Sequence, residues 1–125
     1  MYKNLTIIAL LGAAAILLGA FGAHALKESL SEAGLKSFET AVRYQIYHVI
    51  VLLFVVTYNG FTTKQRRIIS YLFFLGILFF SGSIYLIQLT SITAKSIWFV
   101  TPLGGLCFVF GWVLMSIGFY RRNQQ

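Results

Sequence analysis

Four long apolar runs, separated by short polar segments, dominate the order of residues along the chain. They cover about residues 5–24, 44–61, 68–89 and 97–120. Each holds close to the ~20 residues that a helix needs to cross about 30 Å of hydrocarbon. A transmembrane strand would need about ten residues that alternate between apolar and polar, and these runs do not alternate. The pattern predicts an all-α membrane protein, a single domain over residues 1–125 that folds as a compact bundle of four transmembrane helices.

The composition agrees, since 58% of the residues are hydrophobic and 10% are charged, against roughly half and a quarter in soluble domains. The first run has an alternative, because Lys3 before it and Ala23-His24-Ala25 at its end imitate a signal peptide with its cleavage site. Its apolar length exceeds the roughly 7–15 residues of a signal-peptide core, so we expect a retained helix. The single cysteine, Cys107, lies in the fourth run and forms no intramolecular disulfide.

The distribution of charge predicts the orientation. One side of the four spans receives six basic residues and no acid: Lys3, Lys64, Arg66, Arg67, Arg121 and Arg122. The other side receives four basic residues and every acidic one: Lys27, Lys36, Arg43 and Lys95, with Glu28, Glu32 and Glu39. Because Lys and Arg are enriched in cytoplasmic loops, we predict a multi-pass protein of the cytoplasmic (inner) membrane with both termini in the cytoplasm, N-in and C-in. The net charge of +7 is scattered in short membrane-flanking groups, which fits membrane lipids as partners and not nucleic acid.

Residues 26–43 form an amphipathic stretch between the first two spans. Ser29 and Glu32 have the spacing of a capping box. Charged residues then recur in two i,i+4 pairs on one stripe: Glu32 with Lys36, and Glu39 with Arg43. We predict an amphipathic extracytoplasmic helix here, which either lies at the membrane interface or extends the second span with one face in water.

Small residues recur at helical spacing in the first and fourth runs: Gly12, Ala15, Gly19 and Ala23, then Gly104, Gly111 and Gly118. Small residues let helix backbones approach closely, so these predict packing faces, and they are compatible with a homo-oligomer or a partner membrane protein. Thr101 before Pro102 is the order of an N-cap and a first helical residue. We therefore expect the fourth helix to begin there, with residues 97–100 at the interface.

Polar side chains inside the spans are few, and each costs free energy unless it finds a partner. They are His24, Tyr44, Gln45, His48, Ser81, Tyr85, Gln88 and Thr101. With the predicted orientation, all lie in the outer half of the bilayer or at its rim. They form either a polar cavity open to the outside or a set of interhelical hydrogen bonds with an interfacial tyrosine belt. We expect His24, Gln45, His48 and Tyr85 to approach one another.

Two histidines on different helices raise the question of a cofactor, because bundle cofactors are held by facing helices. His24 and His48 alone do not complete a zinc site, and no carboxylate lies in the outer half of a span. Bis-histidine haem is the alternative that they leave open. The sequence has no Ser-His-Asp set, paired carboxylates or phosphate loop, so we expect neither an enzyme nor a resident cofactor or metal.

Four segments carry a resemblance to a known family: residues 19–26 (GAFGAHAL), 40–48 (TAVRYQIYH), 81–86 (SGSIYL) and 101–105 (TPLGG) with Gly111-Trp112. Their order and spacing resemble the small membrane proteins of the DUF423 group, the YgdD/YwdK-like family. The resemblance implies a four-helix inner-membrane protein of unknown function. It also suggests that His24, Gln45, His48, Tyr85, Thr101 and Pro102 belong to signature segments.

Two classes of function follow from these observations. The first is a binding or structural protein whose polar cluster recognises a small ligand, a lipid headgroup or a partner helix. The second is a small transporter or channel subunit. A transporter needs a polar route through the inner half of the bilayer, and residues 73–78 and 109–114 offer none, which favours the first class.

Overall fold

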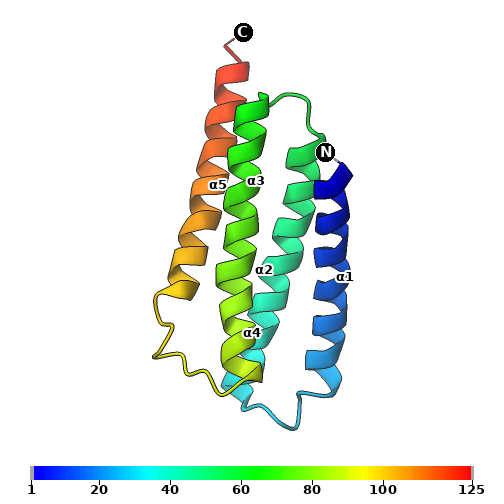
Figure 1. The fold of residues 1–125 in the computed structure, drawn as a ribbon, viewed down its shortest axis with the longest axis vertical. Helices are drawn as coiled ribbons and strands as arrows, with labels where there is room; N and C mark the ends of the chain where they lie inside the picture. Colours follow the sequence, from blue (N-terminus) through cyan, green and yellow to red (C-terminus); the bar gives the residue numbers. More distant parts are fainter. Residues whose placement is uncertain (1, 125) are drawn as a thin grey trace.

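The structure is a computed structural model that describes residues 2–124, and its regular elements are all helical (Figure 1). In chain order they are α1 (Tyr2–His24), α2 (Glu32–Thr57), α3 (Thr63–Gly76), η1 (Ile77–Ser81), α4 (Gly82–Leu89) and α5 (Val100–Arg122). The π-helical turn η1 joins α3 to α4 without a break, so Thr63–Leu89 is one long helix. Within residues 2–124, four helices are therefore long and apolar enough to cross a membrane, which confirms the four predicted spans.

The second helix begins earlier than its hydropathy suggests. Ser31, and not Ser29, is its N-cap, and the Ser31 hydroxyl accepts a hydrogen bond of 3.1 Å from the backbone N–H of Gly34. From Glu32 the helix continues to Thr57 without interruption. From Glu32 on, the amphipathic stretch is thus the first part of α2, which is the second of the two predicted alternatives, and not a separate surface helix. Its four charged residues are all exposed, as expected for a helix face that contacts water.

The start of the last helix also differs from the expectation. Phe99 occupies the N-cap position of α5 and has helical backbone angles, because a turn closed by a 3.0 Å bond from Val100 N–H to Ile97 C=O leads directly into the helix. Thr101 is therefore inside the first turn and does not cap it. Its hydroxyl instead lies 2.5 Å from the hydroxyl of Ser83 on α4.

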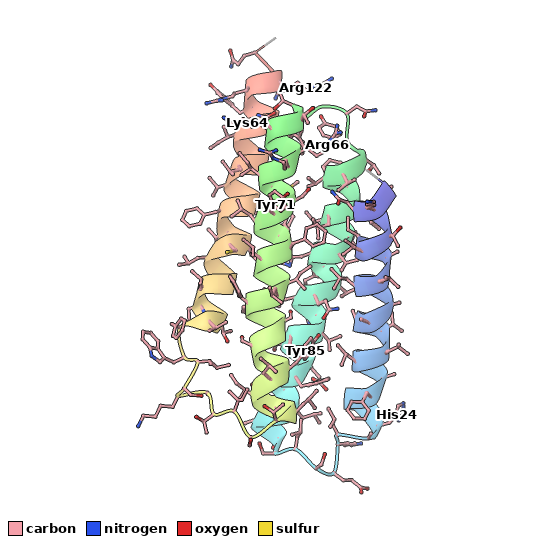
Figure 2. The ribbon with its side chains drawn as sticks, in the orientation of Figure 1. His24, Lys64, Arg66, Tyr71, Tyr85 and Arg122 are labelled. Atoms are coloured by element: carbon pink, nitrogen blue, oxygen red, sulfur yellow. The ribbon has the colours of Figure 1, made fainter. Side chains whose placement is uncertain are left out.

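The start of α1, the end of α5 and the α2–α3 loop lie at one end of the bundle, while the loops 25–31 and 90–99 lie at the other (Figure 1). Figure 2 shows Lys64, Arg66 and Arg122 at the first end and His24 near the second. We call the first end, which carries the six basic residues without an acid, the basic end. Thr62 starts α3 there with a capping box in which Gln65 N–H and the Thr62 hydroxyl are 3.2 Å apart.

Glycines set the contact between α5 and the long third helix. A Cβ on Gly104 would lie 2.2 Å from the backbone N of Phe80, so the two backbones touch at η1. Seven residues later along α5, Gly111 faces the ring of Phe73 on α3, and after seven more Gly118 faces the ring of Phe61 in the loop before α3. At each of these three contacts a Cβ would come within 3.0 Å of its neighbour, so the glycines allow the close approach.

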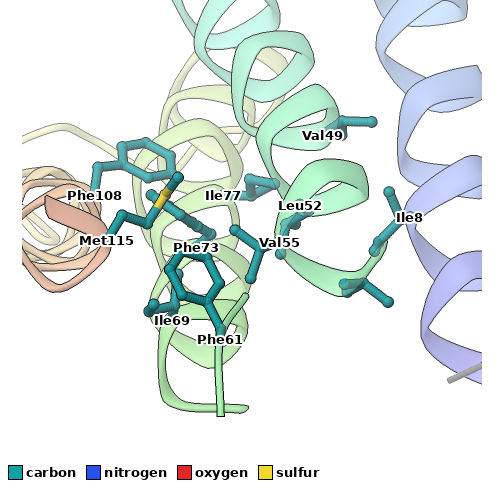
Figure 3. Close-up of a cluster of buried hydrophobic side chains, with 11 residues drawn as sticks. Ile8, Val49, Leu52, Val55, Phe61, Ile69, Phe73, Ile77, Phe108 and Met115 are labelled. Atoms are coloured by element: carbon teal, nitrogen blue, oxygen red, sulfur yellow. The ribbon is translucent and has the colours of Figure 1, made fainter. Parts of the chain in front are cut away.

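Helix α1 packs differently, since its backbone approaches only α2 among the described elements. Gly12 faces Val49, Gly19 faces Val42, and Ala15 between them is buried. Ala23 is exposed and does not extend this face as expected; Gly22, which faces the ring of Phe38, does so instead. The main hydrophobic core lies between α2, α3 and α5, and α1 reaches it through Ile8 (Figure 3).

Candidate functional site

Gln45 connects three helices through its side-chain amide. Its Nε2 donates a 2.8 Å hydrogen bond to the backbone carbonyl of Leu11 on α1, and its Oε1 accepts a 2.7 Å bond from the hydroxyl of Tyr85 on α4. Gln45 is 3% exposed. A buried amide is stable in a membrane only when such partners are present, and this chain of bonds supplies two of them.

A lateral groove opens above this amide, between α1 on one side and the η1–α4 stretch on the other. It has a volume of about 450 Å³. Its walls are apolar, and Gln45 and Tyr85 are its polar residues; the full lining is Leu11, Ala14, Leu18, Gln45, Phe74, Ile77, Leu78, Gly82 and Tyr85. The groove exists because α1 packs on α2 and leaves the third helix unapproached.

Gln45 and His48 lie near the middle of α2, which runs from Glu32 to Thr57. The expectation put them at the start of the second span. The charged, exposed stretch forms the first turns of this helix, and the carbonyl that Gln45 reaches belongs to Leu11, near the middle of α1. A polar side chain near the middle of a span is more costly than one at the interface, which gives the hydrogen bonds around Gln45 more weight.

His48 is held by two partners that define its tautomer. Nδ1 donates to the carbonyl of Tyr44 at 2.7 Å, because a carbonyl can only accept. Nε2 therefore carries the lone pair that accepts the indole N–H of Trp112 at 3.2 Å. The ring also stacks on Phe108, with 3.6 Å between centroids and 9° between planes. The histidine thus joins α2 to α5 as a neutral ring with both nitrogens occupied.

Tyr44 and His48 also line a second groove, on the α5 side of α2, with a volume of about 610 Å³. Pro102 and Trp112 contribute to it from α5. Trp112 was missed by the sequence reasoning as a partner of His48, although it belongs to the Gly111-Trp112 signature. Only the relative rotation of α2 and α5 brings the two rings together.

The two serines of the third helix hold it against its neighbours. Ser81 is fully buried and donates a 2.7 Å bond to the carbonyl of Ala41 on α2. Ser83 meets Thr101 of α5. Gln88 and Thr101 line a smaller hollow near the end opposite the basic one. Ser81, Ser83 and Thr101 therefore make hydrogen bonds between helices.

His24 does not join the others. It is the last residue of α1 and is exposed, at the level of the loops in Figure 2, while His48 faces α5 from the middle of α2. The expected approach of His24, Gln45, His48 and Tyr85 is found only for Gln45 and Tyr85. Ligation of one haem by both histidines is therefore unsupported by this geometry, and His48 has no nitrogen free for an iron.

A pocket at the basic end was not anticipated. It lies between α1, α2 and α3, has a volume of about 290 Å³, and is lined by polar residues that include Asn4, Thr63, Arg66, Arg67 and Ser70. Arg66 Nη2 donates a 3.0 Å bond to the carbonyl of Tyr58, but its Nε is buried and has no partner among the described residues. The sequence marked these arginines only as orientation signals.

Comparison with known proteins identifies the family. Residues 18–105, more than half of the chain, match the family described as "Protein of unknown function (DUF423)". The chain belongs to the DUF423 family. Within this family, "UPF0382 membrane protein SSP2132" of Staphylococcus saprophyticus is 42% identical over 103 residues, covering 82% of this chain and 84% of its own.

Two further members of the DUF423 family show how far the similarity reaches. The "UPF0382 membrane protein" of Haemophilus influenzae is 34% identical and covers 98% of this chain and 97% of its own. The "UPF0382 inner membrane protein YgdD" of Escherichia coli is 34% identical and covers 88% of this chain and 83% of its own. No solved structure matches the chain. The family establishes a membrane protein and carries no assigned activity.

Proposed function

We propose that this DUF423 protein is a lipid-binding protein of the cytoplasmic membrane, with its basic end in the cytoplasm, and that the lateral groove between α1 and η1–α4 holds an acyl chain. The observation that carries the proposal is the Gln45 bridge. Its bonds to Leu11 and Tyr85 tie the two walls of the groove together at the floor.

The lining supports an acyl chain as the occupant. Leu11, Ala14 and Leu18 form one wall, and Phe74, Ile77 and Leu78 form the other, so the walls offer hydrocarbon contacts alone. Gln45 uses one amide N–H and one lone pair of its oxygen for its own partners. A hydrocarbon chain matches the apolar walls, whereas an ion or a polar solute finds too few partners there.

Photo-crosslinking tests this proposal with a matched pair of variants. The purified protein is reconstituted with phosphatidylcholine that carries a diazirine on its acyl chain, and labelled peptides are mapped. Ala14→Phe fills the groove, while Ala13→Phe adds the same ring at a neighbouring exposed position outside the lining.

We expect labelling at the groove residues of the native chain, a clear loss in Ala14→Phe and none in Ala13→Phe. Thermal unfolding of both variants checks that the bundle is intact. Equal labelling of the two variants, or labelling spread evenly over all four helices, contradicts the proposal.

A further inference from the structure

The basic-end pocket and the lateral groove are neighbours along α3 and η1. Phe74 lines both of them. Asn4 borders the pocket and Leu11 borders the groove, both from α1. A single elongated molecule can therefore lie along the gap between α1 and the third helix, with one end among arginines and the other among apolar side chains.

The charge at this end has no internal counterpart. The three acidic residues of the chain, Glu28, Glu32 and Glu39, all belong to the opposite end. No acidic side chain therefore compensates Arg66 and Arg67, and among the described residues the Nε of Arg66 has no hydrogen-bond partner. Arginine donors in such an arrangement match the oxygens of a phosphate.

The distance from the pocket to the far side of the groove matches one leaflet. From Arg67 to Leu78 the helix rises about 16 Å at ~1.5 Å per residue, close to half of the ~30 Å hydrocarbon thickness. A phosphate beside Arg66 and Arg67 thus places the end of its acyl chain near Leu78, at the depth of Gln45. We propose that the ligand is an anionic phospholipid of the leaflet at the basic end, bound by its phosphate at Arg66 and Arg67; this rests on the proposed function of the groove.

Native mass spectrometry tests the headgroup preference. The protein is released from detergent that contains equal amounts of phosphatidylglycerol and phosphatidylcholine with identical acyl chains. We expect retained phosphatidylglycerol to fall about fivefold in Arg67→Gln, the effect of one cationic side chain near a lipid phosphate. Arg66→Gln should show a similar loss, but it also removes the hydrogen bond from Arg66 to Tyr58. Arg67 is exposed, so Arg67→Gln tests the headgroup contact without changing that bond.

Lys64→Gln is the control, because it removes the same charge from an exposed position of the same helix outside the pocket. An equal loss in Lys64→Gln would reduce the preference to the general charge of this end and overturn the inference. Excess glycerol phosphate should not displace the lipid; complete displacement would indicate a site for free phosphate and also overturn it.

The two proposals fail separately. If groove labelling depends on Ala14 but the protein retains both lipids equally, the headgroup site is wrong and the groove function stands. If Ala14→Phe leaves labelling unchanged while Arg67→Gln lowers phosphatidylglycerol retention, the lipid lies outside the groove, and the proposed function is wrong.

Discussion

The hydroxyl of Tyr85 on α4 and the side-chain oxygen of Gln45 on α2 are 2.7 Å apart, and the amide nitrogen of Gln45 continues the chain to α1. Tyr85 also packs its ring against Phe38, with centroids 5.3 Å apart. The bond can therefore be removed without removing the ring. Tyr85→Phe leaves Gln45 Oε1 without its donor, and we expect a loss of about 1 kcal/mol in unfolding free energy.

The comparison for this variant is Tyr47→Phe, which removes a hydroxyl from an exposed tyrosine of α2. Unfolding is measured in one detergent for both. A double-mutant cycle of Tyr85→Phe with Gln45→Leu isolates the pair, since coupled neighbours give non-additive losses. A coupling energy near zero would show that the bond contributes nothing to the bundle.

His48 supports a second prediction, because it fastens α2 to α5. His48→Ala removes the acceptor of the Trp112 N–H and the ring that stacks on Phe108. We expect the unfolding free energy to fall by about 1–2 kcal/mol. Ile50→Ala, on the lipid-facing side of the same helix where Ile50 is 59% exposed, should cost less. Equal costs would mean that His48 has no special role.

The sequence predicted the packing faces better than the polar contacts. Gly104, Gly111 and Gly118 were found from their spacing, because a small residue every seventh position marks a helix face whatever its partner is. His24 was misassigned, since its direction depends on how α1 rotates against α2. One partner of Gln45 is the backbone carbonyl of Leu11. Every residue has such a carbonyl, so the residue types along the chain do not indicate which one Gln45 binds.

The boundaries of α2 illustrate the same limit. The charges of Glu32, Lys36, Glu39 and Arg43 placed the start of the second apolar run at Tyr44, but a helix continues through charged residues when one of its faces is in water. This extension was one of the two predicted alternatives, and the first residue, Glu32, is set by the Ser31 cap and not by hydropathy. The pocket around Arg66 depends on the separation of α1 from α3, which no local pattern encodes.

The orientation supplies a third prediction. Lys64 at the basic end and Lys95 at the opposite end are both exposed, so Lys64→Cys and Lys95→Cys form a matched pair after Cys107 is replaced. Because the basic end should face the cytoplasm, an impermeant thiol reagent added to intact cells should label position 95 and not position 64. Permeabilised cells should show both. Labelling of position 64 in intact cells would reverse the orientation and move the proposed lipid site to the other leaflet.

Gly104 and Gly105 on α5 allow a prediction in which the two changes are chemically identical. A Cβ on Gly104 would meet the Phe80 backbone N at 2.2 Å, whereas one on Gly105 finds only the edge of the Phe80 ring at 3.9 Å. A backbone inside a helix cannot move aside as a side chain does, so Gly104→Ala must separate α5 from η1. We expect it to cost about 1–3 kcal/mol of unfolding free energy, while Gly105→Ala should be neutral or slightly stabilising because alanine favours the helix. Separation also weakens the nearby Ser83–Thr101 contact, so Ser83→Ala should cost less in the Gly104→Ala background than alone. Equal stability of the two glycine variants would show that the backbones of α5 and η1 are not in contact.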